Sequence, residues 1–432
     1  MSRPAPGDRV RTTFRALSHR NFRLFWIGQL ISLVGTWMQS VAQGWLMHRL
    51  TGSAFMLGLL GFAQFLPVML FTLWAGVVAD RMDKRRLILI TQSLALVQAV
   101  VLALVVTLGI VKPWMVIALA SVFGTISAFD LPARQSFLVE MVGREDLPNA
   151  IALNSGAFNA ARVLGPAVAG LVLAAAAGTS YGEAACFWLN AVSYLAVLAM
   201  LLRMDLPRRV AESATGKDAF STLREGVEYA MRTGPIRNLL LLLGVTAGLG
   251  FQYMVLLPVY AREILHADAR AYGLMVSAFG LGSLLAAAVL TRKQDRWALR
   301  RNLQIGLASS GVGMALFAWS RALPLTLAMG FAAGFGLILY VASTNTMLQL
   351  TTEDRFRGRI MGLYTFMFIG TAPLGALLAG WIAQRWGAPM ATSVSAAFLL
   401  GGAVWISWRL RTIAAREAAE RSAVPAFTEK MG

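Results

Sequence analysis

About twelve apolar stretches run through the chain, and each is long enough to cross a lipid bilayer as a helix. A transmembrane helix needs about 20 mostly apolar residues. Backbone polar groups cannot stay unpaired in lipid, so stretches of this length must be helical. We therefore predict an all-α membrane protein whose crossings lie at residues 22–47, 54–79, 87–109, 114–138, 150–176, 184–203, 237–261, 271–291, 303–320, 323–348, 360–384 and 390–410.

The composition agrees with a membrane protein and excludes several other classes. Of 432 residues, 57% are hydrophobic and 14% charged, whereas soluble domains are about half apolar and a quarter charged. The one cysteine, Cys186, cannot form an internal disulfide, and His19, His48 and His266 lie far apart in the sequence. We therefore expect no metal site, no redox pair and no cofactor.

The formal charge of +18 is distributed unevenly between the two sides of the predicted helices. About 32 Lys and Arg residues fall on the side that carries both termini and about six on the other, with Arg162 inside the membrane. This asymmetry follows the positive-inside rule, so we expect both termini in the cytoplasm and an even number of crossings. Anionic lipid is then the natural partner of the basic loops, and nucleic acid is not required.

The longest polar break, residues 204–236, separates six crossings from six more. Within it Phe220, Leu223, Val227 and Met231 recur at helical spacing, which predicts an amphipathic helix on the membrane surface, either a tether or a regulatory element. The predicted organisation is an N-terminal segment, a six-helix bundle, a linker, a second six-helix bundle and a tail, with boundaries at 1–21, 22–203, 204–236, 237–410 and 411–432.

The two predicted bundles resemble each other as a weak internal repeat. A shift of about 212 residues places Gly124 on Gly336 and brings the basic loop 80–86 onto residues 291–296. Two pseudo-symmetric six-helix bundles are a transporter architecture, in which the substrate site lies between the halves near the middle of the membrane.

The loop between the second and third crossings carries the most specific motif. It reads Gly76-Val77-Val78-Ala79-Asp80-Arg81-Met82-Asp83-Lys84-Arg85-Arg86-Leu87. This resembles the G-x-x-x-D-R-x-G-R-R-x-x-L loop of the major facilitator superfamily, except that Asp83 stands where glycine is usual and Lys84 where arginine is. The resemblance covers the whole chain and implies the major facilitator fold.

In that superfamily the loop acts as a cytoplasmic gate. Gly76 would let its helix approach a neighbour closely, and Asp80 would face the N-terminus of the eleventh crossing, near Gly358 and Arg359. We expect such a contact to fasten the two halves in one conformation. The alternative for the basic residues is that they only fix the membrane topology; these residues are Arg81, Lys84, Arg85 and Arg86.

Two further segments indicate a branch within the superfamily. The fifth crossing contains Gly165-Pro166-x-x-Ala169-Gly170, which resembles the G-P-x-x-G-G antiporter motif. Pro166 either bends the helix around a cavity or is ordinary helix geometry. Residues 129–136 and 149–154 are similar to a branch that contains macrolide-efflux and enterobactin-export proteins. The resemblance implies proton-driven efflux of a small organic molecule across a bacterial inner membrane, and we expect a monomer.

Three ionisable residues lie deep within predicted crossings, where charges are costly and usually functional: Asp130, Arg134 and Arg162. Asp130 and Arg134 share a helix face, and Arg162 lies at similar depth on the next crossing. The second half has Ala342 and Thr346 in place of the first two. We therefore expect Asp130 to carry the proton, with desolvation and a nearby arginine changing its proton affinity between conformations. A permanent ion pair is the alternative.

The substrate wall is predicted from polar and aromatic residues inside the crossings, each of which has helix packing as an alternative role. These residues are Trp37, Gln39, Asn154, Asn159, Phe251, Gln252, Tyr253, Tyr340 and Asn345. No nucleotide-binding loop and no credible set of catalytic residues occurs, so we expect a transporter driven by the proton gradient and not an enzyme. The alternatives are an uptake symporter, a lipid-translocating carrier or a transport-deficient receptor.

Overall fold

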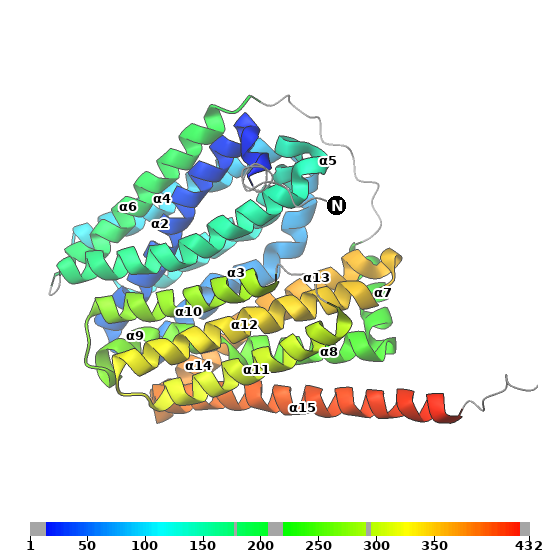
Figure 1. Ribbon diagram of the computed structural model, residues 1–432. Coiled ribbons are helices and arrows are strands. Elements are labelled where there is room, and N and C mark those ends of the chain that lie inside the picture. The colour runs from blue at the N-terminus through cyan, green and yellow to red at the C-terminus, as the bar shows by residue number, and fades with distance from the viewer. Residues whose placement is uncertain (1–13, 177–178, 206–218, 291–294, 424–432) are drawn as a thin grey trace, which may run out of the picture.

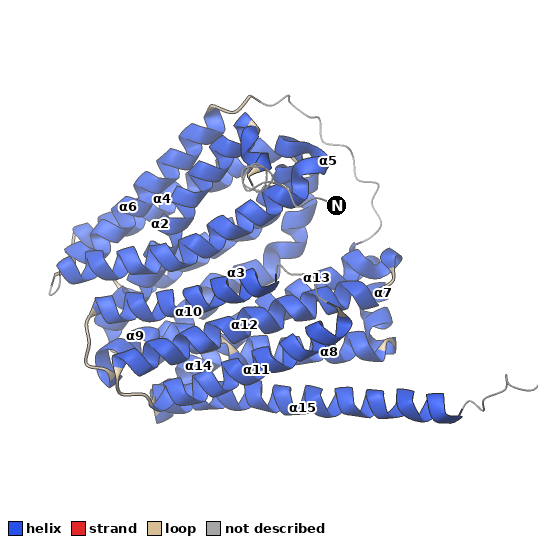
Figure 2. Ribbon diagram, viewed as in Figure 1, coloured by secondary structure: helices blue, strands red, loops and turns tan. Residues whose placement is uncertain are grey.

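The computed structural model describes residues 14–176, 179–205, 219–290 and 295–423, and these ranges are helical throughout, without a strand. Figure 2 shows helices joined by short loops. Within these ranges some side chains lie outside the description, among them those of Asp80, Phe220 and Leu223. The predicted all-α fold is confirmed.

The first half begins with a short 3₁₀ helix and continues with five long helices: η1 (Arg15–Ser18), α2 (Arg20–Thr51), α3 (Ala54–Arg81), α4 (Lys84–Thr107), α5 (Pro113–Ala175) and α6 (Tyr181–Leu202). Helix α5 contains two predicted crossings, 114–138 and 150–176. Its one residue with non-helical dihedrals is Gly143, with φ 71° and ψ 179°. Because L side chains rarely adopt this φ, a glycine marks the boundary between the two crossings.

The second half repeats this order with more interruptions. Its elements are α7 (Ala219–Arg232), α8 (Gly234–Val245), the π-helix η2 (Thr246–Gly250), the 3₁₀ helix η3 (Gln252–Leu256), α9 (Leu257–Val259), the π-helix η4 (Tyr260–Ile264), α10 (Ala269–Leu290), α11 (Arg296–Trp319), α12 (Leu323–Thr351), η5 (Asp354–Phe356), α13 (Arg357–Ile369), α14 (Ala372–Trp386) and α15 (Ala388–Ala423). The predicted crossing 237–261 is therefore a broken helix, and 360–384 is divided at Gly370.

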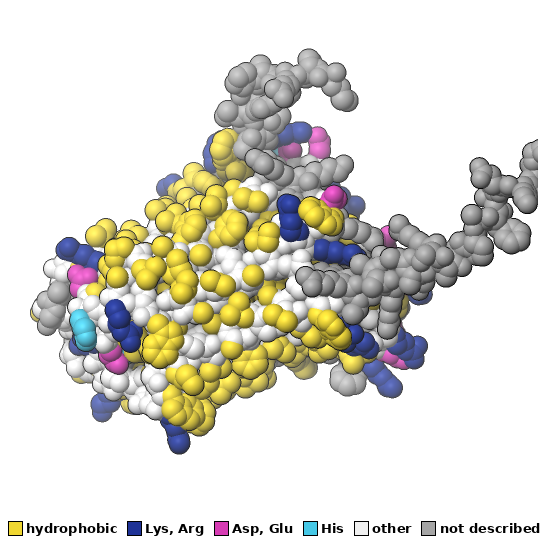
Figure 3. Space-filling model, turned by 60° about the horizontal axis from the view of Figure 1, so that its bottom comes forward, with side chains coloured by type: hydrophobic (Ala, Val, Ile, Leu, Met, Phe, Trp, Pro, Cys, Tyr) yellow, Lys and Arg dark blue, Asp and Glu magenta, His cyan; other side chains and the backbone are white. Residues whose placement is uncertain are grey.

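Ten segments of the described chain are long and apolar enough to cross a membrane. Helix α5 supplies two crossings within one such segment, and the 24-residue α11 is a further candidate, so the helices are consistent with twelve crossings. Charged side chains gather at the two ends of the helices and leave an apolar middle (Figure 3). This distribution matches a molecule embedded in a bilayer.

The helices form two bundles, α2–α6 and α8–α15, drawn above and below in Figure 1. The bundles meet along two pairs of helices, α3 with α14 and α5 with α10. One buried apolar cluster belongs wholly to the first bundle, and the larger one joins residues of both. We call the end that carries η1, α7 and the α3–α4 connection the linker end, and the other the far end.

Equivalent helix caps support the predicted repeat and explain the departure at Asp83. The Asp83 carboxylate accepts a 2.7 Å hydrogen bond from the backbone N–H of Arg86 at the start of α4. Asp295, which lies 212 residues later, accepts an equal bond from Ala298 at the start of α11. Asp83 therefore satisfies an otherwise unpaired N–H group of the helix.

Asp83→Ala and Asp295→Ala are each expected to destabilise the protein by about 1 kcal/mol, the usual cost of losing an N-cap. Thermal unfolding of the purified full chain measures the loss. Asparagine caps a helix about as well as aspartate, so Asp83→Asn provides the control and should stay close to the parent. Equal losses for Asn and Ala would show that charge, and not capping, matters at this position.

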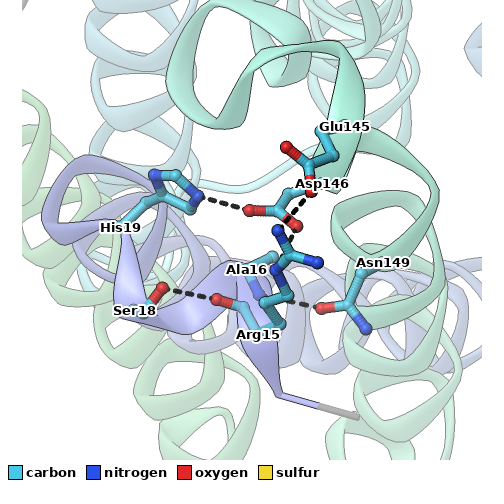
Figure 4. Close-up of polar contacts among 7 residues, drawn as sticks. All are labelled: Arg15, Ala16, Ser18, His19, Glu145, Asp146 and Asn149. Atoms are coloured by element: carbon cyan, nitrogen blue, oxygen red, sulfur yellow. Dashed lines mark hydrogen bonds and ion pairs between the residues drawn. The ribbon is translucent and has the colours of Figure 1, made fainter. Parts of the chain in front are cut away.

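The segment that precedes each bundle docks on the loop between that bundle's fourth and fifth crossings. In the first half, Arg15 lies 2.5 Å from Glu145 and 2.9 Å from Asp146, and His19 lies 2.8 Å from Asp146. Asn149 accepts a 2.9 Å bond from the Ala16 N–H (Figure 4). The hydrogen bond to Glu145 and the nearby carboxylates raise the pKa of Arg15.

In the second half, the amphipathic helix α7 takes the corresponding place. Its Glu225 pairs with Arg359 of α13 at 2.7 Å, and Tyr229 stacks on Phe356 at 4.1 Å between ring centroids. Val227 and Met231 are exposed, as a helix on the membrane surface requires. Two equivalent docked segments agree with the repeat.

Candidate functional site

A cavity of about 310 Å³ lies between the two bundles. Its wall is largely apolar and aromatic, and it includes one charged side chain, Arg162. No carboxylate occurs among the described residues that line it. They are Trp37, Ser40, Val41, Gly44, Leu57, Leu60, Gly61, Gln64, Phe65, Arg162, Ala247, Phe251, Gln252, Met254, Val255, Pro258, Tyr272, Val276, Leu337, Phe368, Ile369 and Ala372.

A second hollow, of about 470 Å³, lies on the outer surface between α8 and α15. Among the described residues of its wall only Trp405 and Thr246, which is itself fully buried, carry a polar group, and neighbours such as Leu241 and Val245 are about half exposed. Such a wall offers little with which to orient a polar ligand, so the central cavity is the better candidate for a selective site.

The far end of the cavity is closed by glycines at which the two bundles touch. A Cβ atom added to Gly58 of α3 would lie 2.5 Å from the Ala376 carbonyl oxygen of α14 and 2.9 Å from the Cα of Gly380. A Cβ at Gly273 of α10 would lie 2.5 Å from the Pro166 carbonyl oxygen of α5. Both bundle contacts therefore depend on the absence of a side chain.

Polar and aromatic contacts reinforce this closure. His48 of the first bundle lies 2.8 Å from Glu263 of the second, and the Ser53 hydroxyl donates a 2.8 Å hydrogen bond to Gln384. The Arg262 guanidinium lies 5.0 Å from the Trp45 ring centroid. The far end is therefore sealed by contacts between the halves.

The linker end is open. A Cβ atom at Gly76 of α3, or at Gly358 or Gly362 of α13, would meet nothing within 4 Å. Gly76 lies about 27 Å along α3 from Gly58 at 1.5 Å per residue, so the tight contact of α3 with the second bundle at Gly58 does not extend to Gly76. The close approach expected at Gly76 is absent in this conformation, because the halves diverge there.

The basic loop also makes its contacts within one half. Lys84 pairs with Glu140 of α5 at 2.8 Å, and Arg85 donates to the carbonyl oxygens of Leu201 and Leu202, the last residues of α6. Arg81 and Arg86 are exposed.

Arg359, expected near Asp80, instead pairs with Glu225 of α7. Because the Asp80 side chain lies outside the described residues, its gating role stays a prediction. In this open conformation the described residues of the motif do not join the halves.

Asp130 is held inside the first bundle by three partners. Its carboxylate lies 2.5 Å from the Arg134 Nε, and it accepts hydrogen bonds from the Thr91 hydroxyl at 2.7 Å and the Gln92 amide at 2.9 Å. Asp130 is 9% exposed. Despite Pro132 between them, Asp130 and Arg134 form the ion pair expected from their helical spacing.

Arg162 is equally buried but does not join this group. It lies in the wall of the central cavity, with its guanidinium carbon 5.8 Å from the centroid of the Trp37 ring. Similar depth on adjacent crossings therefore did not bring Arg162 to Asp130, because Arg162 lines the cavity between the bundles and Asp130 does not.

The antiporter-like motif packs against both halves. A Cβ at Gly165 would lie 2.6 Å from the Cβ of Trp37 in α2, and one at Gly170 would lie 3.0 Å from the Ala269 carbonyl oxygen in α10. Pro166 is buried, and α5 keeps helical dihedrals through it. The motif therefore sets the distances between α5 and its neighbours.

The residues predicted for the substrate wall divide into two groups. Trp37, Phe251 and Gln252 line the cavity. Gln39 does not; it accepts a bond from Asn190 and donates one to Gln98 within the first bundle. The others also lie outside the cavity wall. Tyr253 stacks on Phe279, and Tyr340 shares a hydrogen bond with Thr246. Asn345 accepts a hydrogen bond from Gln349, Asn159 donates one to the Ser155 carbonyl oxygen of its own helix, and Asn154 is half-buried.

Comparison with known proteins places this architecture among transporters. The chain is 24% identical to the staphyloferrin A transporter of Staphylococcus aureus over 82% of its length and 88% of that protein. It is 27% identical to the multidrug efflux pump Tap of Mycolicibacterium fortuitum, covering 82% and 87% of the two chains. It is 26% identical to the enterobactin exporter EntS of Escherichia coli, covering 84% and 85%.

Solved structures give the same fold at lower identity. A bacterial homologue of the lysosomal transporter Spinster, in an inward-facing and occupied conformation, matches with a TM-score of 0.71 and 13% identity, covering 91% of this chain and 97% of that one. An inward-facing bacterial homologue of the iron transporter ferroportin matches with a TM-score of 0.69 and 16% identity, covering 90% and 98%.

The model of one family, described as transmembrane secretion effector, matches residues 11–431. This match spans nearly the whole chain, and the relatives named above are efflux-type transporters of the major facilitator superfamily. The chain therefore belongs to the transmembrane secretion effector family of major facilitator superfamily transporters.

Proposed function

We propose that this protein exports small amphipathic organic molecules across a bacterial inner membrane by alternating access, driven by the proton gradient. The linker end would face the cytoplasm, in agreement with the positive-inside distribution of its basic residues. The protein would act as a monomer in contact with membrane lipids, with the proton gradient in place of a cofactor.

The observation that carries this proposal is the asymmetry of the central cavity. Glycine contacts and polar pairs seal its far end, whereas Gly76, Gly358 and Gly362 at the linker end have no neighbour within 4 Å. A carrier that alternates must break one set of contacts and form the other. The motif around Gly76 and Asp80 would supply the second set in the outward-open conformation.

Asp130 is the proposed proton carrier. Its carboxylate is buried beside Arg134, and no equivalent acid stands in the second half, where Ala342 and Thr346 occupy the matching positions. A proton that binds one conformation more tightly than the other shifts the equilibrium between them, which is the requirement for coupling.

Transport in inverted membrane vesicles tests the proposal. With an acid interior, vesicles that contain the protein should accumulate dansyl-labelled amphipathic compounds, and an uncoupler should abolish the accumulation. Vesicles without the protein provide the control. Accumulation that survives the uncoupler would contradict proton coupling, and gradient-driven accumulation only in right-side-out vesicles would identify an uptake symporter.

A further inference from the structure

The side chain of Arg162 is an unpaired cation in the wall of the central cavity. It is 9% exposed, and its Nε is buried without a hydrogen-bond partner. The described residues provide no ion pair to it, and its guanidinium carbon lies 5.8 Å from the centroid of the Trp37 ring. A guanidinium never loses its charge in a protein, so this cavity wall carries a permanent positive charge.

Arg134, which does not line the cavity, shows how this fold compensates the charge of a buried arginine. Arg134 has Asp130 at 2.5 Å as a counter-charge. Arg162 has none, and the described residues that line its cavity include no carboxylate. A buried charge without a partner is costly, whereas one at a ligand site is compensated when the ligand supplies the opposite charge.

The Arg162 guanidinium donates hydrogen bonds to an anionic oxygen. The rest of the wall is largely apolar and aromatic, with Trp37, Phe251 and Phe368 among its residues. Its other polar side chains, among them Gln64 and Gln252, are neutral. The wall therefore combines one charged group with a large apolar surface.

We propose that the cavity is selective for amphipathic organic anions, whose carboxylate, sulfonate or phenolate group binds Arg162 while the apolar body packs against the aromatic wall. This inference rests on the proposed export function and specifies its substrate class. A guanidinium binds a carboxylate through two parallel hydrogen bonds, which fixes orientation as well as charge. A cationic ligand would meet a like charge and, among the described lining residues, no acid.

Equilibrium binding of three dansyl compounds to the purified full chain in lipid nanodiscs tests this assignment. Dansylglycine is an anion, dansylamide is neutral and dansylcadaverine is a cation. The parent protein should bind dansylglycine more tightly than the other two. Arg162→Gln should weaken dansylglycine binding by roughly 10- to 100-fold, the loss expected for a charge-assisted hydrogen bond, and should leave dansylamide binding within about twofold.

Two further variants keep the test interpretable. Arg162→Lys retains the charge and should retain most of the preference for the anion. Leu70→Ala changes an exposed residue outside the cavity wall and should leave the three affinities unchanged. Thermal unfolding establishes that each variant is folded.

The proposal is wrong if the parent binds dansylglycine no more tightly than dansylamide, if it prefers dansylcadaverine, or if Arg162→Gln weakens all three equally. Because binding requires no gradient, these results are independent of proton-driven transport. Anion binding without gradient-driven transport would contradict the proposed function and leave the selectivity of the cavity intact.

Discussion

Gly58→Leu is expected to open the far end of the transporter. A Cβ at Gly58 would already lie 2.5 Å from the Ala376 carbonyl oxygen, and a leucine side chain would have to push α3 away from α14. Overpacking a close contact costs about 1–3 kcal/mol, which corresponds to a shift of roughly 5- to 150-fold in the ratio of closed to open far ends. Gradient-driven export should fall by a similar factor.

Labelling of a cavity cysteine measures this shift. Ser40→Cys, in a chain whose native thiol is removed by Cys186→Ala, places a reactive group in the cavity wall. A membrane-impermeant maleimide added from the far side should react at least fivefold faster after Gly58→Leu. Gly76→Leu, on the same helix, should have the opposite effect, because it obstructs closure of the linker end.

Leu70→Ala provides the control on α3, since Leu70 is 53% exposed. Its labelling should match that of the parent from both sides. Unchanged far-side labelling in Gly58→Leu would mean that the contact between α3 and α14 does not control access to the cavity.

Asp130→Asn is expected to abolish gradient-driven accumulation, a loss of about 100-fold or more, because an amide cannot bind and release the coupled proton. Flux down a substrate gradient should continue, since the cavity and its gates are unchanged. Both quantities are measured in proteoliposomes with an imposed pH difference, and Asp130→Glu should restore part of the coupling.

The single substitution also leaves Arg134 as an uncompensated buried charge, and breaking such a pair costs about 3–5 kcal/mol. Asp130→Asn combined with Arg134→Gln removes both charges and should recover much of that stability. If the double variant is stable and remains uncoupled, Asp130 acts in proton transfer. If it regains gradient-driven transport, the pair is structural and the proton carrier lies elsewhere.

Most of the helical architecture was predictable because membrane spanning sets strict length and polarity requirements. The boundary at Gly143 lies between the predicted crossings 114–138 and 150–176, where the charged residues Arg144, Glu145 and Asp146 interrupt the apolar pattern. The interrupted seventh crossing was missed. Gly248 and Gly250 lie where its helix loosens into π and 3₁₀ turns, and Pro258 follows, so local flexibility overrides the uniformly apolar pattern.

The candidate site was only partly predictable, because sequence spacing does not determine how a helix is rotated in its bundle. Trp37 and Gln39 lie two residues apart on α2, yet Trp37 faces the cavity and Gln39 bonds to Asn190 and Gln98. Tyr272 was not predicted because it lies near a helix end. The glycines that close the far end, such as Gly58, could not be distinguished among the chain's 40 glycines.

Alternating access requires the two ends of the molecule to open and close reciprocally around one cavity. Spin labels on cysteines at Leu202 of α6 and Trp297 of α11, which are each 66% exposed, report on the linker end. Labels at Tyr181 and Trp386, which are 69% and 58% exposed, report on the far end.

Double electron–electron resonance spectroscopy measures the distance between the two spin labels of each pair. The measurements are made in the Cys186→Ala background, with and without Gly58→Leu. Gly58→Leu is expected to shorten the distance at the linker end and to lengthen the distance at the far end. Distances that change in the same direction at both ends, or an unchanged linker end beside an opened far end, would contradict alternating access.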